Sequence, residues 1–210
     1  MSTIVFRVIE YKKDDKWQLV KWYVPYSNTE YHNKDEEVYI LPNDEKVCKR
    51  AILMDNPCDF RDYFLGNGMF NKNNKINCNG FPDDMSDETK KIVPSEDDMY
   101  YHSKTYYTIP MLNELLTKAK AERNNELGKL DEKRLLYKIR FAIGKEPKKG
   151  TNEYKELKED EEYDEETKEY YNTKVECIEN EIELIRSIVE EMDFDSFFKD
   201  EKIRVICWLS

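Results

Sequence analysis

The order of apolar and polar residues divides the chain into a strand-rich part and a helix-rich part. Apolar side chains alternate over residues 4–12, and an aromatic, β-branched pattern resumes over 17–23, after the polar residues 14–16. Alternation on both sides of a polar turn predicts a β-hairpin. Farther along, 38–41 predicts a short strand, and 46–54 is a short apolar segment whose type the pattern leaves open.

The middle of the chain contains a strand-to-helix junction. Residues 100–107 are rich in tyrosine and threonine, which favours an extended strand. Thr108 can then cap a helix that has Pro110 in its first turn and Leu112 at the start of an apolar stripe. We expect one long helix from 109 to about 143, because Gly144 follows it.

Two shorter segments before the junction also carry helix signals. Residues 56–66 predict one or two helical turns, and the Asn- and Gly-rich residues 67–79 predict a loop. Ser86 is placed to cap a short helix that ends near Val93, with Asp87 and Glu88 in its first turn.

A second long helix is predicted near the end of the chain. Residues 148–164 are interpreted as a charged connector, and a heptad pattern of apolar residues follows it. This seam consists of Tyr171, Val175, Ile178, Ile182, Ile185, Val189 and Met192. Two long helices joined by a connector most simply form a protruding antiparallel hairpin. The seam can pack within the chain or mediate a homodimer.

The fold class follows from these elements. The strongly apolar segment 203–209 predicts a strand inside a sheet. We therefore expect an α+β fold, with a small mixed or antiparallel sheet that contains both chain ends, short helices and the long protruding hairpin. The predicted core spans 1–116 and 193–210, and the hairpin insertion spans 117–192.

Composition restricts the partners and the compartment. The net charge of −11 argues against direct nucleic-acid binding through a basic face, but permits a basic partner or a nucleic-acid mimic. No apolar run reaches the length of a membrane span and no signal-peptide pattern is present, so a cytoplasmic protein is expected. The 5 cysteines lack Cys-x-x-Cys spacing, which favours free thiols without a metal or other cofactor.

Three groups of polar residues are candidates for a ligand-binding site. Arg61 lies among aromatic residues, where it could hold a phosphate or carboxylate, or pair with an aspartate. The neighbouring aspartates Asp83 and Asp84 could cap a helix or bind Mg²⁺. The strand residues His102 and Ser103 point to opposite faces, so no catalytic pair is assigned. The candidate ligand-binding residues are Arg61, Asp62, Tyr63, Asp83, Asp84, His102, Ser103 and Tyr106.

Five segments carry a further signal: the hairpin 11–22, and residues 60–65, 80–86, 102–108 and 203–208. Together they resemble a family of uncharacterised proteins encoded by bacteriophages and their bacterial hosts. Members of that family match the last four segments with an R-N/D-Y-x-L-F segment, a G-L-P-D-D-x-S turn, an H-S-x-S-W/Y-L-T junction and a terminal V-R-x-V-F-W-F-D strand. The resemblance implies a phage setting and action on host machinery.

The functional expectation is a phage accessory protein that acts by binding. It would inhibit a host defence factor through the hairpin, or sequester a nucleotide-like signal in a pocket that includes Arg61, Tyr63 and His102. One alternative is a small enzyme acting on a nucleotide or ADP-ribose-type ligand, with His102 as acid or base. Another is an acidic mimic of nucleic acid that presents the carboxylates of 159–169.

Overall fold

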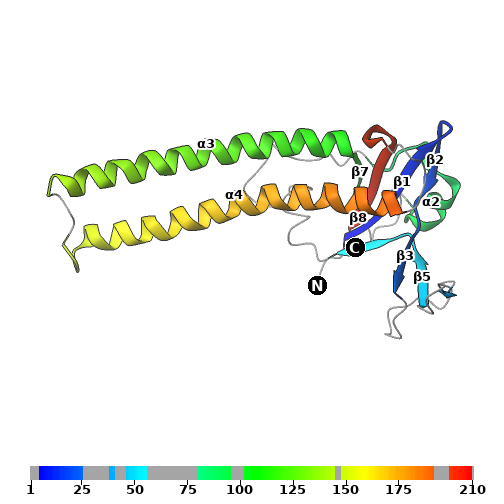
Figure 1. Cartoon of the computed structure of the whole chain (residues 1–210), viewed down its shortest axis with the longest axis horizontal. Helices are drawn as coiled ribbons and strands as arrows, with labels where there is room; N and C mark the ends of the chain where they lie inside the picture. Colours follow the sequence, from blue (N-terminus) through cyan, green and yellow to red (C-terminus); the bar gives the residue numbers. More distant parts are fainter. Residues whose placement is uncertain are drawn as a thin grey trace. The chain divides into compact units, whose positions relative to one another are not determined.

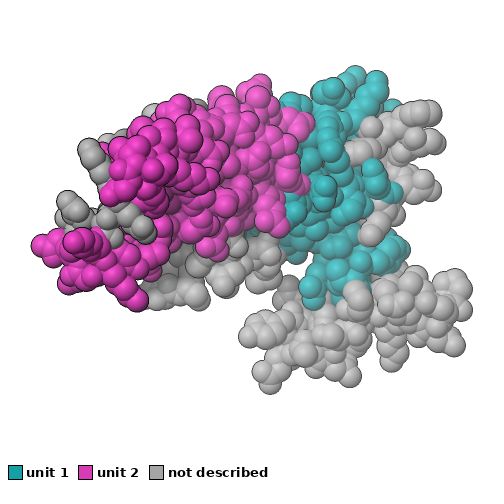
Figure 2. Space-filling view, turned by 60° about the vertical axis from the view of Figure 1, so that its left-hand side comes forward, with its two compact units in different colours: residues 1–112, 180–210 teal, residues 113–179 magenta. Residues whose placement is uncertain are grey.

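The computed structural model of the chain describes residues 5–25, 38–40, 46–55, 80–95, 102–144, 148–191 and 199–209. The chain divides into two compact units, coloured separately in Figure 2. Unit 1 comprises Met1–Leu112 and Asn180–Ser210, and unit 2 comprises Asn113–Glu179. The sheets and short helices belong to unit 1, and most of the two long helices belongs to unit 2.

Unit 1 is built on an antiparallel sheet in which the first and last strands are neighbours (Figure 1). Strands β1 (Val5–Lys13) and β8 (Ile203–Leu209) pair along seven residues, from Val5 opposite Leu209 to Tyr11 opposite Ile203. Strand β7 (His102–Thr108) borders β8, while β2 (Lys16–Leu19) and β6 (Leu53–Asp55) both pair with β1. The predicted sheet containing both chain ends is confirmed.

The predicted N-terminal hairpin is confirmed, and its second strand divides between two sheets. Asp14 and Asp15 both adopt positive φ, at 50° and 60°, which gives the two-residue turn the twist that antiparallel strands require. Strand β2 ends at Leu19, and β3 (Trp22–Pro25) pairs instead with β5 (Lys46–Arg50). With β4 (Val38–Ile40), these strands form a second, three-stranded sheet.

The main sheet is covered on both faces within unit 1. On one face, Val8, Leu19, Ile206 and Trp208 form a cluster with Phe81, which belongs to the described segment 80–95. On the other face, Glu181 of α4 reaches side chains of β1 and β7. A strand covered on both sides needs apolar residues at most consecutive positions, which explains why six of the seven residues of β8 are apolar, with Arg204 as the exception.

Two of the predicted helix starts in unit 1 are confirmed, whereas the helical turns predicted over 56–66 and the loop predicted over 67–79 lie outside the described residues. Helix α2 (Asp87–Ile92) begins after Ser86, whose hydroxyl accepts a hydrogen bond from the Thr89 amide at 3.1 Å. At the junction, β7 ends at Thr108 and α3 (Ile109–Ala142) begins at the next residue. The Thr108 hydroxyl accepts from the Met111 amide at 3.4 Å, which is the geometry of a helix N-cap.

The interpretation of 148–164 as a connector is wrong for most of that segment. Helix α4 runs from Asn152 to Glu191, so only a few residues separate it from α3. Thr151 supplies the start signal, because its hydroxyl accepts a hydrogen bond from the Tyr154 amide at 3.3 Å. The segment has the Glu and Lys content of a good helix former and no Pro or Gly after 151, although it has few apolar residues to reveal a periodic stripe.

Five of the seven seam residues are buried within the single chain, as the intramolecular interpretation expected: Val175, Ile178, Ile182, Ile185 and Val189 are each at most 4% exposed. Tyr171 is partly buried, and Met192 lies outside the described residues. A short 3-10 helix, η2 (Asp200–Lys202), precedes β8. Together these elements give an α+β fold with antiparallel sheets and a pair of long helices.

Candidate functional site

The structure describes the side chains of only three of the predicted ligand-binding residues. Arg61, Asp62 and Tyr63 lie outside the described residues. The backbone of His102 and Ser103 forms the start of β7, but their side chains also lie outside the described part. The binding pocket proposed around Arg61 and His102 therefore stays a prediction. The three described side chains are those of Asp83, Asp84 and Tyr106.

Asp84 belongs to a charged network that fastens the segment before α2 to the main sheet. Its carboxylate accepts a hydrogen bond from Arg204 Nη1 at 2.5 Å and another from Trp17 Nε1 at 2.9 Å. The Arg204 guanidinium lies 3.9 Å from the centre of the Trp17 ring, a cation–π contact. The hydrogen bond from Arg204, followed by that from Trp17, holds the pKa of Asp84 below its usual range.

The same arginine connects Asp84 to a buried carboxylate on β1. Arg204 Nε donates to Glu10 Oε2 at 2.8 Å, and Glu10 Oε1 accepts from the Ser86 amide at 2.8 Å. Both Glu10 and Arg204 are buried. Because Arg204 and the amide occupy these carboxylate oxygens, the arrangement is suited to positioning the turn rather than to binding a metal ion.

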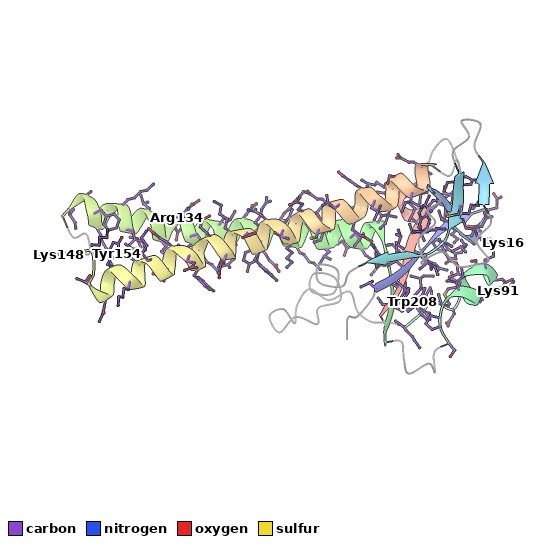
Figure 3. All side chains as sticks on the ribbon, turned by 90° about the horizontal axis from the view of Figure 1, so that it is seen from below. Lys16, Lys91, Arg134, Lys148, Tyr154 and Trp208 are labelled. Carbon is purple, nitrogen blue, oxygen red and sulfur yellow. The ribbon has the colours of Figure 1, made fainter. Side chains whose placement is uncertain are left out.

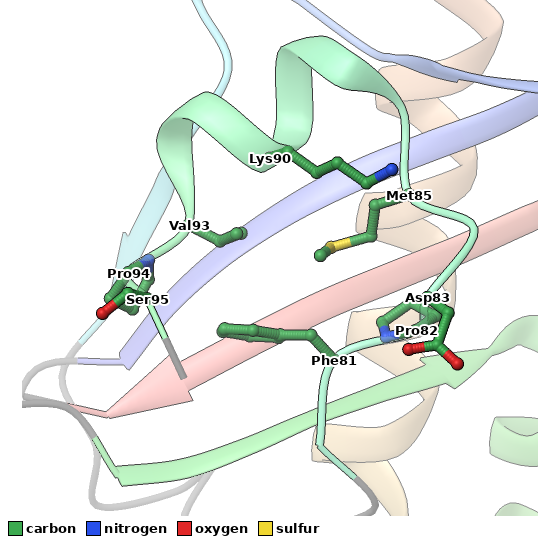
Figure 4. A pocket seen from close by; sticks show the side chains of 8 residues that line it. All are labelled: Phe81, Pro82, Asp83, Met85, Lys90, Val93, Pro94 and Ser95. Carbon is green, nitrogen blue, oxygen red and sulfur yellow. The ribbon is translucent and has the colours of Figure 1, made fainter. Parts of the chain in front are cut away.

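A small pocket opens beside this network, under α2 (Figure 4). It has a volume of about 390 Å³ and is lined by Phe81, Pro82, Asp83, Met85, Lys90, Val93, Pro94 and Ser95. Figure 4 shows Phe81, Met85 and Val93 around one shared space, with Asp83 beside Pro82. The pocket lining combines apolar side chains with the charged side chains of Asp83 and Lys90, and it includes one of the predicted site residues.

Tyr106 and Tyr107 point to opposite faces of the main sheet and have different surroundings. Tyr106 packs against the hydrophobic cluster that contains Trp208. Tyr107 is fully buried on the other face, where its hydroxyl donates to Glu181 at 2.5 Å. Burial, together with the charge of Glu181, raises the pKa of Tyr107 well above its ordinary value. The Tyr107 hydroxyl therefore stays protonated at neutral pH.

Glu181 also forms a buried ion pair with Arg7 of β1. Burial acts to lower the pKa of Arg7, but Tyr107 and Glu181 outweigh that effect and raise the pKa above its ordinary value. Sequence reasoning missed this cluster of Arg7, Tyr107 and Glu181. A signal was present, because Glu181 directly precedes Ile182 of the heptad seam and Arg7 interrupts an apolar strand.

Unit 2 is an antiparallel pair of helices held by charged side chains. Lys120 pairs with Glu179 at 2.6 Å, and farther along α3, Lys133 pairs with Asp164 at 3.1 Å. Between them, Lys174 of α4 is 2% exposed and pairs with Glu122 at 2.8 Å. These ion pairs orient one face of α3 towards α4, and they fix the register of the two helices.

The far half of α3 carries an apolar face that is exposed to solvent. Leu135, Leu136 and Ile139 of α3 are exposed by 58%, 63% and 51%. Ile143, the residue after the end of α3, is exposed by 62%, and its amide continues the helical pattern by donating to the Ile139 carbonyl at 3.2 Å. The spacing of these residues places them on one side of the helix, whereas Tyr137 and Phe141 lie about 200° around from Leu135 and Ile139. We refer to Leu135, Leu136, Ile139 and Ile143 as the α3 apolar face. The sequence showed these residues as part of a helix, but it did not show which of them faces α4.

A cleft lies between the helices, next to the apolar face. It has a volume of about 530 Å³ and is lined by Arg134, Tyr137, Lys138, Phe141, Leu157, Asp160, Glu161, Asp164 and Glu165. The Tyr137 and Phe141 rings stack with their centres 6.5 Å apart, and the Tyr137 hydroxyl donates to Asp160 at 2.8 Å. Figure 3 shows Arg134 on α3 and Tyr154 near the start of α4 in this part of the hairpin.

The cationic side chains around the α3 apolar face fall into two classes. Lys133 and Arg134 are paired with carboxylates of α4. Lys138 and Arg140 are exposed, and neither forms an ion pair with another residue of the described ranges. The end of the hairpin therefore combines exposed aliphatic and exposed cationic side chains, in a chain whose net charge is −11.

Comparison with protein-family models, curated proteins and solved structures found no match. Within the described ranges, no group of His, Cys, Asp and Glu side chains could hold a metal ion. None of the helices described is apolar over a stretch long enough to cross a membrane. Among the described cysteines, Cys48 and Cys207 are buried and Cys177 is partly buried.

Proposed function

We propose that this chain is a non-enzymatic binding protein that docks another protein on the α3 apolar face. The observation that carries the proposal is the exposure of four large aliphatic side chains on one side of α3 and of the turn that ends it. Single exposed leucines are ordinary on protein surfaces, but a contiguous group is typical of an interaction site. In the phage setting that the resemblance implies, the partner would be a host protein, such as a defence factor that the chain inhibits.

The energetics are those of a modest contact. Complete burial of a leucine or isoleucine side chain contributes about 1.5–3 kcal/mol, and these side chains are already partly buried, so the four together would contribute about 4 kcal/mol. Association also costs translational and side-chain entropy. We therefore expect the α3 apolar face to be the centre of an interface with further polar contacts around it.

The polar clusters of unit 1 support binding rather than catalysis. The described carboxylates Glu10, Asp84 and Glu181 each accept hydrogen bonds from side chains or amides of the same chain. A general base needs a carboxylate or imidazole that can reach a substrate proton. These three are engaged in holding the fold.

Capture from host lysate tests the proposal. The tagged full chain is compared with the double variant Leu135→Gln/Ile139→Gln, in which glutamine keeps a high helix propensity. The control Glu162→Gln/Glu166→Gln introduces glutamine with the same spacing at exposed positions of α4. Quantitative mass spectrometry should show proteins retained by the wild type and the control but lost from the apolar-face variant. Identical captured proteins for all three chains would overturn the proposal.

A further inference from the structure

Resting on the proposed function, we infer that the α3 apolar face binds an amphipathic helix whose apolar stripe is flanked by aspartate and glutamate. The shape of the face favours a helix as its occupant. Its four side chains follow the i, i+1, i+4, i+8 pattern along about 12 Å of α3, which a second helix can match over two to three turns.

Charge decides which amphipathic helix fits best. Lys138 and Arg140 lie about 100° to either side of Ile139, so they flank the apolar face on both edges. Both are exposed, whereas Lys133 and Arg134 already pair with Asp164 and Glu165 of α4. A partner with carboxylates beside its apolar stripe would pair with Lys138 and Arg140, and a basic partner would be repelled.

The charges also predict the register of the partner. Asp131 and Glu132 precede the apolar face by one turn, and both are exposed. The cationic flanks therefore lie beside the later part of the face, around Ile139 and Ile143. We expect the acidic residues of the partner to lie opposite that end, with neutral or basic residues opposite Asp131 and Glu132.

Two other occupants fit less well. A second copy packing its own α3 apolar face antiparallel would bring Arg140 of each copy towards the same edge, where like charges repel. A broad anionic surface, such as a membrane, would also approach the carboxylates of α4 at 160, 161 and 165, which line the cleft beside Lys138. A single helix laid along α3 can avoid them.

The test uses the full chain and two labelled synthetic peptides with the same apolar stripe. One peptide carries glutamate on both flanks and the other carries lysine, and circular dichroism is used to match their helicity. We expect the glutamate peptide to bind about tenfold more tightly by fluorescence anisotropy, because two exposed ion pairs replace two repulsive contacts. Raising the salt concentration should reduce the difference.

Two variants make the result specific to this face. Lys138→Glu/Arg140→Glu should reverse the preference, so that the lysine peptide binds more tightly. Leu135→Gln/Ile139→Gln should weaken binding of the glutamate peptide at least about tenfold, since it removes apolar area common to every complex. Unchanged binding by the apolar-face variant would place the peptide elsewhere and overturn the inference.

The remaining outcomes separate this inference from the proposed function. Equal binding of the two peptides, or a preference for lysine, overturns the charge argument. The face could instead mediate dimerisation, measured by sedimentation, or binding to anionic phospholipid vesicles. If either is lost in Leu135→Gln/Ile139→Gln and the glutamate peptide does not bind, the face belongs to that occupant and the inference is overturned. Capture of lysate proteins that depends on the α3 apolar face, with neither peptide bound, keeps the proposed function and removes only the helix assignment.

Discussion

The buried cluster of Arg7, Tyr107 and Glu181 is the residue-level feature that joins α4 to the main sheet of unit 1. Arg7 is 1% exposed, and its ion-pair partner Glu181 is 7% exposed. Removing one member of a buried ion pair leaves the other charge without compensation, whereas replacing all members by apolar residues can be neutral. The cluster therefore fixes the packing geometry more than it adds net stability.

Replacing Glu181 with alanine should lower the free energy of unfolding by about 3–5 kcal/mol. The triple variant Arg7→Met/Tyr107→Phe/Glu181→Leu should recover most of that loss, because no charge or hydroxyl then remains buried. Urea denaturation followed by tryptophan fluorescence measures both. Glu183→Ala changes an exposed residue on the same helix and serves as the control. If Glu181→Ala costs no more than this control, the cluster does not have the role assigned to it.

Asp84 leads to a prediction about pH. Its folded-state pKa lies below the usual aspartate value, mainly because of the hydrogen bond from Arg204. A depressed pKa means that the carboxylate contributes stability above the unfolded pKa and loses it as the pH falls through the folded pKa. The contribution should be small, since the Asp84 side chain is 67% exposed.

The stability difference between the wild type and Asp84→Asn should be constant near neutral pH and should shrink below about pH 4. Urea denaturation at a series of pH values down to about pH 3 measures it. The matched control is Asp83→Asn, which makes the same replacement at the exposed neighbouring position. A difference that grows as the pH falls would contradict the assigned direction of the pKa shift.

At the scale of elements, the sequence predicted best where local signals and apolar periodicity agree. Ser86 and Thr108 are recognisable helix N-caps, and Gly144 adopts the positive φ of 72° that favours glycine just beyond the end of α3. The sequence pattern did not show that residues 152–164 belong to α4. This part of α4 contacts α3 through ion pairs, such as Lys133 with Asp164, rather than through a regular apolar stripe. Such pairs depend on the second helix and leave no periodic pattern in the sequence.

A proline in that segment tests its helical state. Glu162→Pro should cost about 3 kcal/mol and reduce the helical signal in far-UV circular dichroism, because proline removes a backbone hydrogen bond and clashes with the preceding turn. Glu162→Ala should leave the signal unchanged or slightly increased, since Glu162 is exposed and alanine has the highest helix propensity. A charged connector would instead accept proline without any change in helicity.

The candidate site was less predictable than the fold, for reasons that operate at the scale of the whole chain. The pairing of Arg204 with Glu10 and Asp84 joins residues from three distant segments, and nothing in the local sequence reports such a contact. The α3 apolar face depends on which side of α3 meets α4. Leu135 and Phe141 are both apolar in the sequence, and only the pairing of the helices separates the exposed residue from the one that lines the cleft.

The division into two units makes a final prediction about the whole molecule. Excision of 130–167, with Lys129 joined to Lys168 by about four loop residues, preserves the pairs Lys120–Glu179 and Lys174–Glu122 while removing the α3 apolar face. Unit 1 holds its own sheet and its own buried cluster, so it should keep a cooperative unfolding transition within about 1 kcal/mol of the wild type.

The 3 tryptophans make this measurable, because Trp17, Trp22 and Trp208 all lie in unit 1. Their fluorescence follows unit 1 alone, while far-UV circular dichroism should record the lost helix. The shortened chain should also retain none of the lysate proteins whose capture requires Leu135 and Ile139. If the fluorescence transition broadens or disappears, unit 1 needs the removed helices in order to fold. If capture survives the excision, another surface of the chain binds the partner.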